Sequence, residues 1–228
     1  ALPYYLQASE EVKLTEDYRL AYLIYSHIGM IYAHRKLHEY SVSYCEQANE
    51  YALLSEDPYY IIESYNCLAR TYSMQGKNEK AIMYYDKAIE IGELSNEKKV
   101  LTSSIHEKMA VYMSEERYEE AWNVSKTLDH NQLSLAGNLT IGRLLYNMNK
   151  LDSAYYYLNK AVQSDNIYTR RGAYQVLFNL SKKQKDYEKN AEYSVKLWKI
   201  NDSINKIDRN KALIEMQEKY DEQRVRDE

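Results

Sequence analysis

Glycine and proline are both scarce in this chain of 228 residues, which contains 6 Gly and 2 Pro. Average usage is about 7 % and 5 %. Both residues interrupt helices, because proline lacks a donor N–H and glycine is conformationally free. Long stretches that contain neither residue therefore favour an all-α protein.

Two further absences exclude classes of partner. The 30 basic and 34 acidic residues give a net charge of −4, and no stretch is uniformly basic. We therefore expect no direct nucleic-acid contact by this chain. The densest basic run, between residues 182 and 189, is interrupted by two acidic residues and is interpreted as a solvated helix face. No apolar run approaches the roughly eighteen residues that a membrane span needs.

Catalytic and cofactor motifs are also missing. The sequence has no Gly-rich phosphate loop, no Ser-centred elbow, no CxxC and no HExxH, so we expect neither enzyme activity nor a cofactor. Cys45 and Cys67 are the only cysteines; they are interpreted as packed free thiols, because two thiols define neither a metal site nor a disulfide framework. His34 and His38 flank an expected turn and are interpreted as exposed polar residues rather than metal ligands.

Tyrosine is abundant, with 26 residues against a single phenylalanine, Phe178. A tyrosine side chain combines an apolar ring with a hydroxyl that prefers water. This composition suits thin layers in which no side chain is far from solvent.

The chain repeats itself with a period of forty residues. Tyr32, Tyr72 and Tyr112 are forty residues apart, and so are the small residues at positions 1, 41, 81 and 121. A fixed period between about 20 and 50 residues is typical of one supersecondary unit stacked on copies of itself. The period therefore predicts one array and favours binding over catalysis.

The second copy is the clearest and consists of two helical stripes separated by a glycine. Its large and small residues are Tyr65, Leu68, Ala69, Tyr72, Gly76, Ala81, Tyr85 and Ala88. Spacings of three and four on either side of Gly76 predict two helices joined by a turn. Small residues at the crossing let antiparallel helices approach closely, while larger neighbours fill the flanking grooves.

This pattern resembles the tetratricopeptide repeat (TPR), whose signature places W/Y, L, G/A and Y on a first helix and A, F/Y and A on a second. The second copy matches it at eight positions in register. The resemblance implies an all-α, TPR-like right-handed superhelix, or α-solenoid, of antiparallel helix pairs. The period exceeds the usual 34 by six residues, so we expect helices about three residues longer.

Degraded copies extend the array over residues 1–200. The expected helix pairs occupy about 16–55, 57–95, 97–129, 131–164 and 166–200, and residues 1–13 look like the second helix of an earlier repeat, which indicates further sequence upstream. The fifth pair departs most, with Asn190 in place of alanine and Ser194 in place of an aromatic residue. After Ala121 the spacing shortens to 33 and then 36 residues, so we expect the superhelix to change near residue 130.

Residues 201–228 are expected to form one more, charged helix, which Asp202 or Ser203 can cap. The segment contains an apolar stripe of Leu213, Met216 and Tyr220 and the i,i+4 pairs Glu215–Lys219 and Glu222–Arg226. The stripe is too short to predict a sustained coiled coil.

This tail is similar to the junction found in a class of Gram-negative bacterial regulators, in which TPR arrays end in segments like 201–204 and 215–220. In that class a membrane helix follows, and then a histidine kinase or a helix-turn-helix output domain. The resemblance implies that the chain is the sensor portion of a transmembrane signalling or transcription regulator. It would then lie on the periplasmic side of the inner membrane, tethered through sequence beyond residue 228.

In the TPR family, first-helix residues that do not pack on a neighbour line a concave groove. The resemblance carries this role onto Asn66, Arg70, Ser73, Ser103, His106, Met113, Leu139, Arg143, Tyr146, Gln175, Asn179 and Lys182. Four of them resemble the Lys/Arg/Asn set that holds a peptide's terminal carboxylate in some members: Asn66, Arg70, Arg143 and Lys182. Charged donors suit that role because they form short hydrogen bonds with carboxylate oxygens.

The predicted function is therefore a protein–protein interaction scaffold that binds a protein or peptide in the groove. The alternatives are a free-standing TPR adaptor, which would be cytoplasmic, and a structural array that self-associates as a homodimer through its tail. Direct sensing of a small molecule has only the tyrosine-rich groove in its favour.

Overall fold

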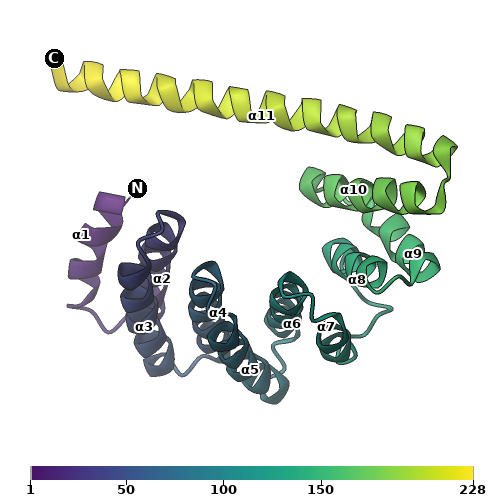
Figure 1. Ribbon diagram of the computed structural model, residues 1–228. Helices are drawn as coiled ribbons and strands as arrows, with labels where there is room; N and C mark the ends of the chain where they lie inside the picture. The colour runs from purple at the N-terminus through teal and green to yellow at the C-terminus, as the bar shows by residue number, and fades with distance from the viewer. Residues whose placement is uncertain (1, 228) are drawn as a thin grey trace. The chain divides into compact units, whose positions relative to one another are not determined.

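The computed structural model describes the backbone of residues 2–227 and the side chains of residues 2–217. Within these limits the chain is a succession of α-helices without strands (Figure 1), as the all-α prediction required. The helices are α1 (Leu2–Val12), α2 (Tyr18–His34), α3 (His38–Leu54), α4 (Pro58–Met74), α5 (Asn78–Leu94), α6 (Lys98–Ser114), α7 (Tyr118–Ser125), α8 (Leu135–Asn147), α9 (Leu151–Ala161), α10 (Ile167–Gln184) and α11 (Tyr187–Asp227).

The long period is reflected in the helix lengths. Helices α2 to α6 each contain 17 residues, which confirms the expectation of long helices. Among the later elements, α7 has only 8 residues and α9 has 11. The shortening begins in the part of the chain where the spacing of small residues falls below forty.

The turn inside each pair is the same structure at every repeat. The amide N–H of Leu37, Lys77 and Arg117 donates to the carbonyl of the tyrosine five residues earlier, at 2.9–3.0 Å. One residue before each donor the backbone is left-handed, with φ of 60° at Lys36, 72° at Gly76 and 59° at Glu116. This arrangement is a Schellman motif, which closes a helix by satisfying its last carbonyls. The repeated tyrosines therefore mark the last turn of α2, α4 and α6.

The N-termini of α2, α4 and α8 are instead capped by side chains. Asp57 accepts a hydrogen bond from the amide of Tyr59, and Pro58 occupies the first helical position. Asp17 and Ser134 cap α2 and α8 through the amides of Leu20 and Gly137. Acceptors at this position satisfy amides that would otherwise lack a partner.

Small residues lie at the helix crossings, as predicted. Ala81 and Ala88 of α5 are both completely buried. A Cβ atom at Gly29 of α2 would lie 2.6 Å from the Cys45 sulfur of α3. The absence of a side chain at this position therefore sets how closely α2 and α3 approach.

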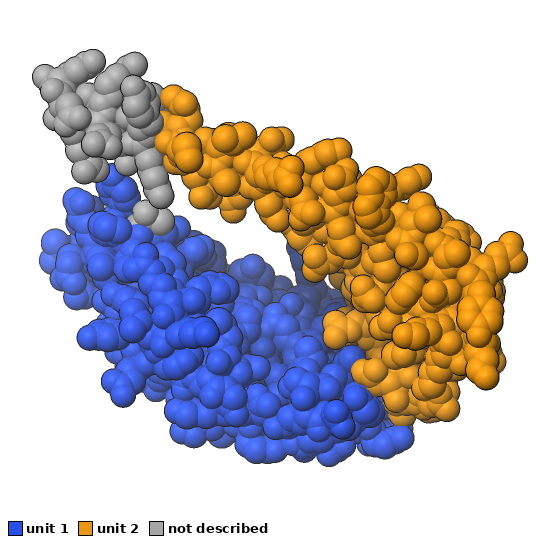
Figure 2. Space-filling model, turned by 45° about the horizontal axis from the view of Figure 1, so that its top comes forward, with its two compact units in different colours: residues 1–128 blue, residues 129–228 orange. Residues whose placement is uncertain are grey.

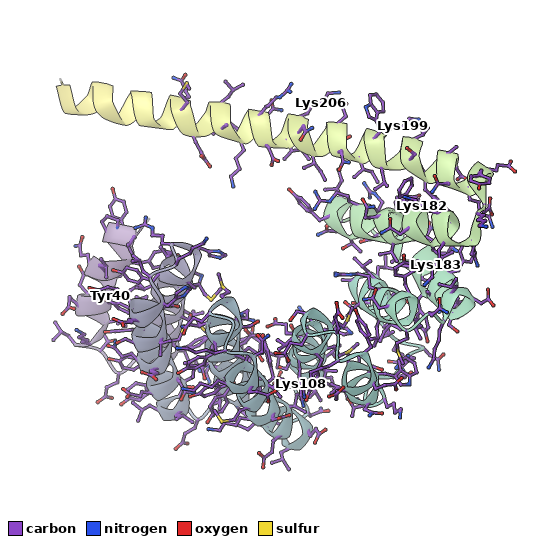
Figure 3. All side chains as sticks on the ribbon, in the orientation of Figure 1. Tyr40, Lys108, Lys182, Lys183, Lys199 and Lys206 are labelled. Carbon is purple, nitrogen blue, oxygen red and sulfur yellow. The ribbon has the colours of Figure 1, made fainter. Side chains whose placement is uncertain are left out.

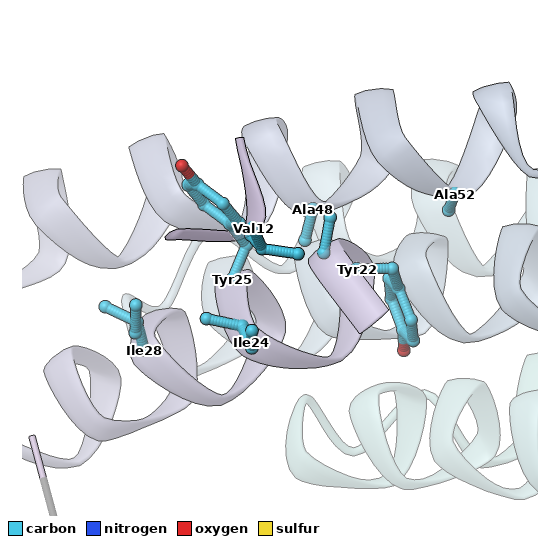
Figure 4. Close-up of a cluster of buried hydrophobic side chains, with 8 residues drawn as sticks. Val12, Tyr22, Ile24, Tyr25, Ile28, Ala48 and Ala52 are labelled. Carbon is cyan, nitrogen blue, oxygen red and sulfur yellow. The ribbon is translucent and has the colours of Figure 1, made fainter. Parts of the chain in front are cut away.

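Tyrosine rings fill much of the space between the layers. Figure 4 shows the cluster formed around Tyr22 and Tyr25 of α2 with Val12 of α1 and the alanines of α3. Tyr25 is 1 % exposed, and its ring lies 5.1 Å from that of Tyr51. Tyr5 of α1 packs against the same cluster, as the half-repeat prediction implies.

The helices form two compact units, residues 1–128 and residues 129–228, coloured separately in Figure 2. The first contains α1 to α7 and the second α8 to α11. The division coincides with the position near residue 130 where the sequence predicts a change in the array.

The fifth helix pair compensates for its departures from the repeat pattern. The Asn190 side chain donates to the Phe178 carbonyl at 3.0 Å and to the Ser181 hydroxyl at 3.1 Å, so α10 and α11 are joined by hydrogen bonds where the second, third and fourth pairs have alanine. Ser194 is exposed, and the neighbouring Tyr193 is buried in its place.

The tail differs from the prediction of a separate helix. Helix α11 runs without interruption from Tyr187 to Asp227, so the predicted cap at Asp202 or Ser203 is wrong. The Ser203 hydroxyl instead donates to the Lys199 carbonyl inside the helix. Ile204, just after this position, is 6 % exposed, so the helix still packs on its neighbours there.

Leu213 and Met216 are exposed, at 63 % and 69 %. The predicted tail contacts of Tyr220, Lys219, Glu222 and Arg226, and the predicted packing of Ala1, lie outside the described side chains. Among the described residues, no helix is long and apolar enough to cross a bilayer.

Candidate partner-binding groove

The first helices of successive pairs line two hollows in unit 1. The first, of about 260 Å³, is lined by Tyr22, Leu23, Ser26, His27, Met30, Tyr59, Glu63, Cys67 and Arg70. The second, of about 410 Å³, is lined by Met30, His34, Arg70, Ser73, Met74, Tyr85, Glu107, Ala110, Val111 and Ser114. Because Met30 and Arg70 border both hollows, we treat them as one surface, the α2–α4–α6 groove.

Arg70 is the central charged residue of this groove. Its Nη1 donates to both carboxylate oxygens of Glu107, at 3.0 and 3.1 Å, and its Nη2 lies 3.5 Å from Glu63. The hydroxyl of Tyr85 donates to Glu107 at 2.9 Å. The guanidinium is therefore already held by two carboxylates from α4 and α6.

These contacts affect the protonation of the cluster. Burial disfavours the charge on Arg70, but the carboxylates of Glu107 and Glu63 outweigh this effect and raise the pKa of Arg70 above its ordinary value. Burial, together with the Glu107 carboxylate, raises the pKa of Tyr85. The tyrosine hydroxyl thus stays protonated and remains a hydrogen-bond donor.

Several predicted groove residues lie in unit 1, in different environments. Ser73 lines the second hollow beside Arg70, whereas His106 and Met113 are half-buried on α6. Asn66 is completely buried, so its amide is not on the groove surface. Ser103 lies 3.5 Å from Glu107 and supports the ion pair.

The remaining predicted residues belong to unit 2. Arg143, Gln175 and Lys182 are exposed, and Tyr146, Asn179 and Leu139 are half-buried. Lys182 and Lys183 lie on α10 (Figure 3), and the Lys183 ammonium stands 5.6 Å from the centre of the Tyr146 ring. The predicted set of four donors is thus divided between the two units.

The sequence prediction missed Glu63, Glu107 and Tyr85. A signal for Glu107 was present, because His27, Cys67 and Glu107 form a column at forty-residue spacing next to the column of Met30 and Arg70. Glu107 directly follows His106, which is in the predicted groove set, so adding the next residue of that helix would have included it. The ion pair between Glu107 and Arg70, however, joins residues of two different columns, and the sequence alone does not indicate it.

The two histidines at the first turn face different surroundings. His34 lines the second hollow, and His38 borders a separate hollow with Val42 and Gln75. In the described part of the chain, no group of three or more His, Cys, Asp or Glu side chains is placed to hold a metal ion.

Comparison with known proteins supports the repeat architecture. Residues 20–94 match the family described as tetratricopeptide repeat. A search of curated proteins found no match.

Solved structures share the fold over most of the chain. BtubC (BKLC) from P. vanneervenii is 17 % identical, with a TM-score of 0.70 over 90 % of this chain and 91 % of that one. A putative kinesin light chain from Podosopora anserina with TPR-like repeats is 19 % identical, with a TM-score of 0.63 over 85 % and 99 %. MamA from Desulfovibrio magneticus RS-1 is 17 % identical, with a TM-score of 0.59 over 80 % and 96 %. At these identities the similarity shows the fold alone: the chain has a TPR-like solenoid fold and TPR sequence at residues 20–94.

Proposed function

We propose that the chain is a non-catalytic protein–protein interaction scaffold, and that the α2–α4–α6 groove binds an extended segment or a helix of a partner protein. The observation that carries this proposal is the pair of adjoining hollows on either side of Arg70. Their lining combines apolar side chains with a few polar groups, a mixture that supplies both affinity and orientation. TPR repeats generally mediate protein–protein interaction, which supports the same function.

The charge of the groove favours a basic or neutral partner segment. Two carboxylates, Glu63 and Glu107, surround the single guanidinium of Arg70. Residues 1–128 contain 13 Lys and Arg and 20 Asp and Glu, a formal charge of −7. A terminal carboxylate would have to compete with both glutamates for Arg70, whereas a lysine or arginine would complement the excess negative charge.

Methionine makes the second hollow adaptable. Met30 of α2 and Met74 of α4 both line it, together with Val111 of α6. Methionine side chains are flexible and polarizable and accommodate apolar groups of different shape. We therefore expect the partner segment to combine apolar residues with at least one basic residue.

A selection from a random peptide library displayed on phage, panned against the full chain, tests this function. We expect the enriched peptides to be apolar and basic, and to lose at least about tenfold in affinity with Met74→Glu. Met83→Glu is the matched control, because Met74 and Met83 are 44 % and 45 % exposed but Met83 lies on α5, away from the groove. Equal losses for both variants, or enrichment of acidic peptides, would contradict the groove assignment.

We further propose that the scaffold is the sensor portion of a bacterial transmembrane signalling or transcription regulator, on the periplasmic side of the inner membrane. Support comes from the similarity of segments 201–204 and 215–220 to the junction of such regulators. Alkaline phosphatase fused after residue 228 of the full-length protein should be active if the junction is periplasmic. An inactive, stably expressed fusion would favour a cytoplasmic adaptor.

Self-association is the alternative, and exposed apolar residues on α11 favour it. Trp198, Ile207 and Ile214 are 68 %, 49 % and 59 % exposed. Sedimentation equilibrium over a range of concentrations separates the two functions. A concentration-dependent dimer that Ile207→Asp abolishes supports self-association through α11, and a monomer at the highest concentration excludes it for this chain.

A further inference from the structure

The only two cysteines of the chain meet between neighbouring helix pairs. The sulfur atoms of Cys45 on α3 and Cys67 on α4 are 2.8 Å apart, closer than a van der Waals contact between two sulfurs. A disulfide bond is about 2.05 Å long, so the two sulfurs need only a small approach. Both thiols are buried, at 0 % and 1 % exposure.

The pair lies in a hydrophobic cluster with Leu68, but one polar side chain contacts it. The hydroxyl of Thr71 lies 3.4 Å from the Cys45 sulfur and 3.3 Å from the hydroxyl of Ser41. The hydrogen bond with Cys67 lowers the pKa of Cys45, and the hydroxyl of Thr71 acts in the same direction. The same hydrogen bond, together with burial, raises the pKa of Cys67. Cys45 is thus the more acidic of the two thiols.

The fold also provides space and access. Gly29 has no side chain where a Cβ atom would lie 2.6 Å from the Cys45 sulfur, so α2 leaves room for that sulfur. Cys67 lines the first hollow of the α2–α4–α6 groove. A small reagent in that hollow therefore reaches Cys67 before Cys45.

We propose that Cys45 and Cys67 form a redox site, a reversible disulfide that links the second helix of the first pair to the first helix of the second pair. This inference is independent of what the groove binds. In the structure both cysteines are buried free thiols, as expected from the sequence, and the proposal concerns the bond that they form on oxidation.

The oxidant is a disulfide, either of low molecular weight or carried by a thiol–disulfide oxidoreductase. Cys45, the more acidic thiol, first releases its proton to solvent. Cys67 then passes its proton to the Cys45 thiolate and attacks one oxidant sulfur, which breaks the oxidant S–S bond, forms a mixed disulfide and releases one thiolate. That thiolate takes the proton from Cys45. Cys45 then attacks the Cys67 sulfur, forms the internal disulfide and displaces the second thiolate, which is protonated from solvent. The two cysteines lose two electrons, and the oxidant disulfide becomes two thiols.

The test is incubation of the folded chain with oxidised glutathione, followed by alkylation with N-ethylmaleimide in denaturant and intact mass spectrometry. We expect a loss of two hydrogen atoms, no alkylation, and full reversal by dithiothreitol. Because the chain has only two cysteines, intact mass reports on this pair directly. Two alkylated thiols, two glutathione adducts or a disulfide-linked dimer as the main product would overturn the proposal.

Thermal unfolding distinguishes a disulfide that fits the native structure from one that distorts it. The bond closes a segment of 22 residues, and we expect oxidation to raise Tm by about 5–10 °C. A Cys67→Ser variant should show no dependence of Tm on glutathione. A lower Tm in the oxidised wild-type protein would also contradict the proposal, because it would mean that the bond does not fit the fold.

Discussion

Arg70 and Glu107 join the first helices of two successive pairs, and both carboxylate oxygens of Glu107 accept hydrogen bonds from Nη1 of Arg70. Their side chains are 32 % and 29 % exposed, so the pair is partly shielded from water. Removing one partner of such a pair leaves the other charged and poorly hydrated, and that costs more than removing both. The cluster is thus a structural link in the groove as well as a potential contact for a partner.

We expect Arg70→Leu and Glu107→Leu each to lower the free energy of unfolding by about 2 kcal/mol. The double variant should lose at least about 1 kcal/mol less than the sum. Urea denaturation followed by circular dichroism measures all three. Arg19→Ala is the control: Arg19 pairs with Asp57 but is 61 % exposed, so the loss should stay below about 1 kcal/mol. Additive losses would show that Arg70 and Glu107 do not interact in solution.

Two glycines should respond differently to alanine. At Gly76 the φ of 72° is unfavourable for alanine but nothing lies within 4 Å of an added Cβ, so the loss should be about 1 kcal/mol, from the backbone alone. At Gly29 the added methyl meets the Cys45 sulfur, and the helices must separate. We expect a loss of about 2 kcal/mol or more there, measured as a shift in the urea midpoint. A larger loss at Gly76 than at Gly29 would contradict this assignment.

The same turn predicts stabilising substitutions. Lys36 and Glu116 occupy the position of Gly76 in their repeats and have φ of 60° and 59°. Glycine adopts this conformation without the steric cost that other residues incur. Lys36→Gly and Glu116→Gly should each raise the free energy of unfolding by up to about 1 kcal/mol. Glu39→Gly, inside the first turn of α3, is the control and should be destabilising; stabilisation there would refute the argument.

Much of the fold was predictable because each repeat carries the same spacing. The column of Tyr32, Tyr72 and Tyr112 established the forty-residue period, and small residues such as Ala81 marked the crossings. The tail was predicted less well. A capping residue at Asp202 indicated a new helix, but α11 continues through this position, and Ile204 is buried there. Local capping signals do not include such packing, so the sequence alone favoured a break.

The groove was predictable only in part. The resemblance to TPR proteins indicated Arg70 and Ser73, which do line the hollows. It did not indicate that Glu107, 37 residues later, accepts two hydrogen bonds from Arg70. The forty-residue register places Arg70 level with Ala110, whereas in the structure Arg70 pairs with Glu107, three residues earlier on α6.

The fifth pair offers a test of the hydrogen bonds that replace the repeat pattern. The family signature has alanine at the position of Asn190, so Asn190→Ala would improve the match. The Asn190 amide donates to Phe178 and Ser181, and we expect its removal to cost about 1 kcal/mol. Ser194→Ala, at an exposed position, should change stability by less than about 0.5 kcal/mol. Stabilisation by Asn190→Ala, read from thermal denaturation, would show that the alanine crossing is preferred here too.

The side chain of Asn66 is completely buried, and neither polar atom of its amide has a hydrogen-bond partner in the structure. Burying an unpaired amide costs about 1–3 kcal/mol, and leucine has a similar volume without that cost. Asn66→Leu should therefore raise the free energy of unfolding by about 1 kcal/mol.

Asn138 is the matched control for this change. It is 4 % exposed, but its amide donates to the carbonyls of Leu133 and Ser134. Asn138→Leu should lose about 1–2 kcal/mol. If both variants lose stability equally in urea, Asn66 must be hydrogen-bonded in solution, and an ordered water bound to its amide would be the explanation to test by crystallography. Opposite signs would establish that Asn66 is unpaired in solution as well, and that the repeat retains a polar residue at a position where an apolar one is more stable.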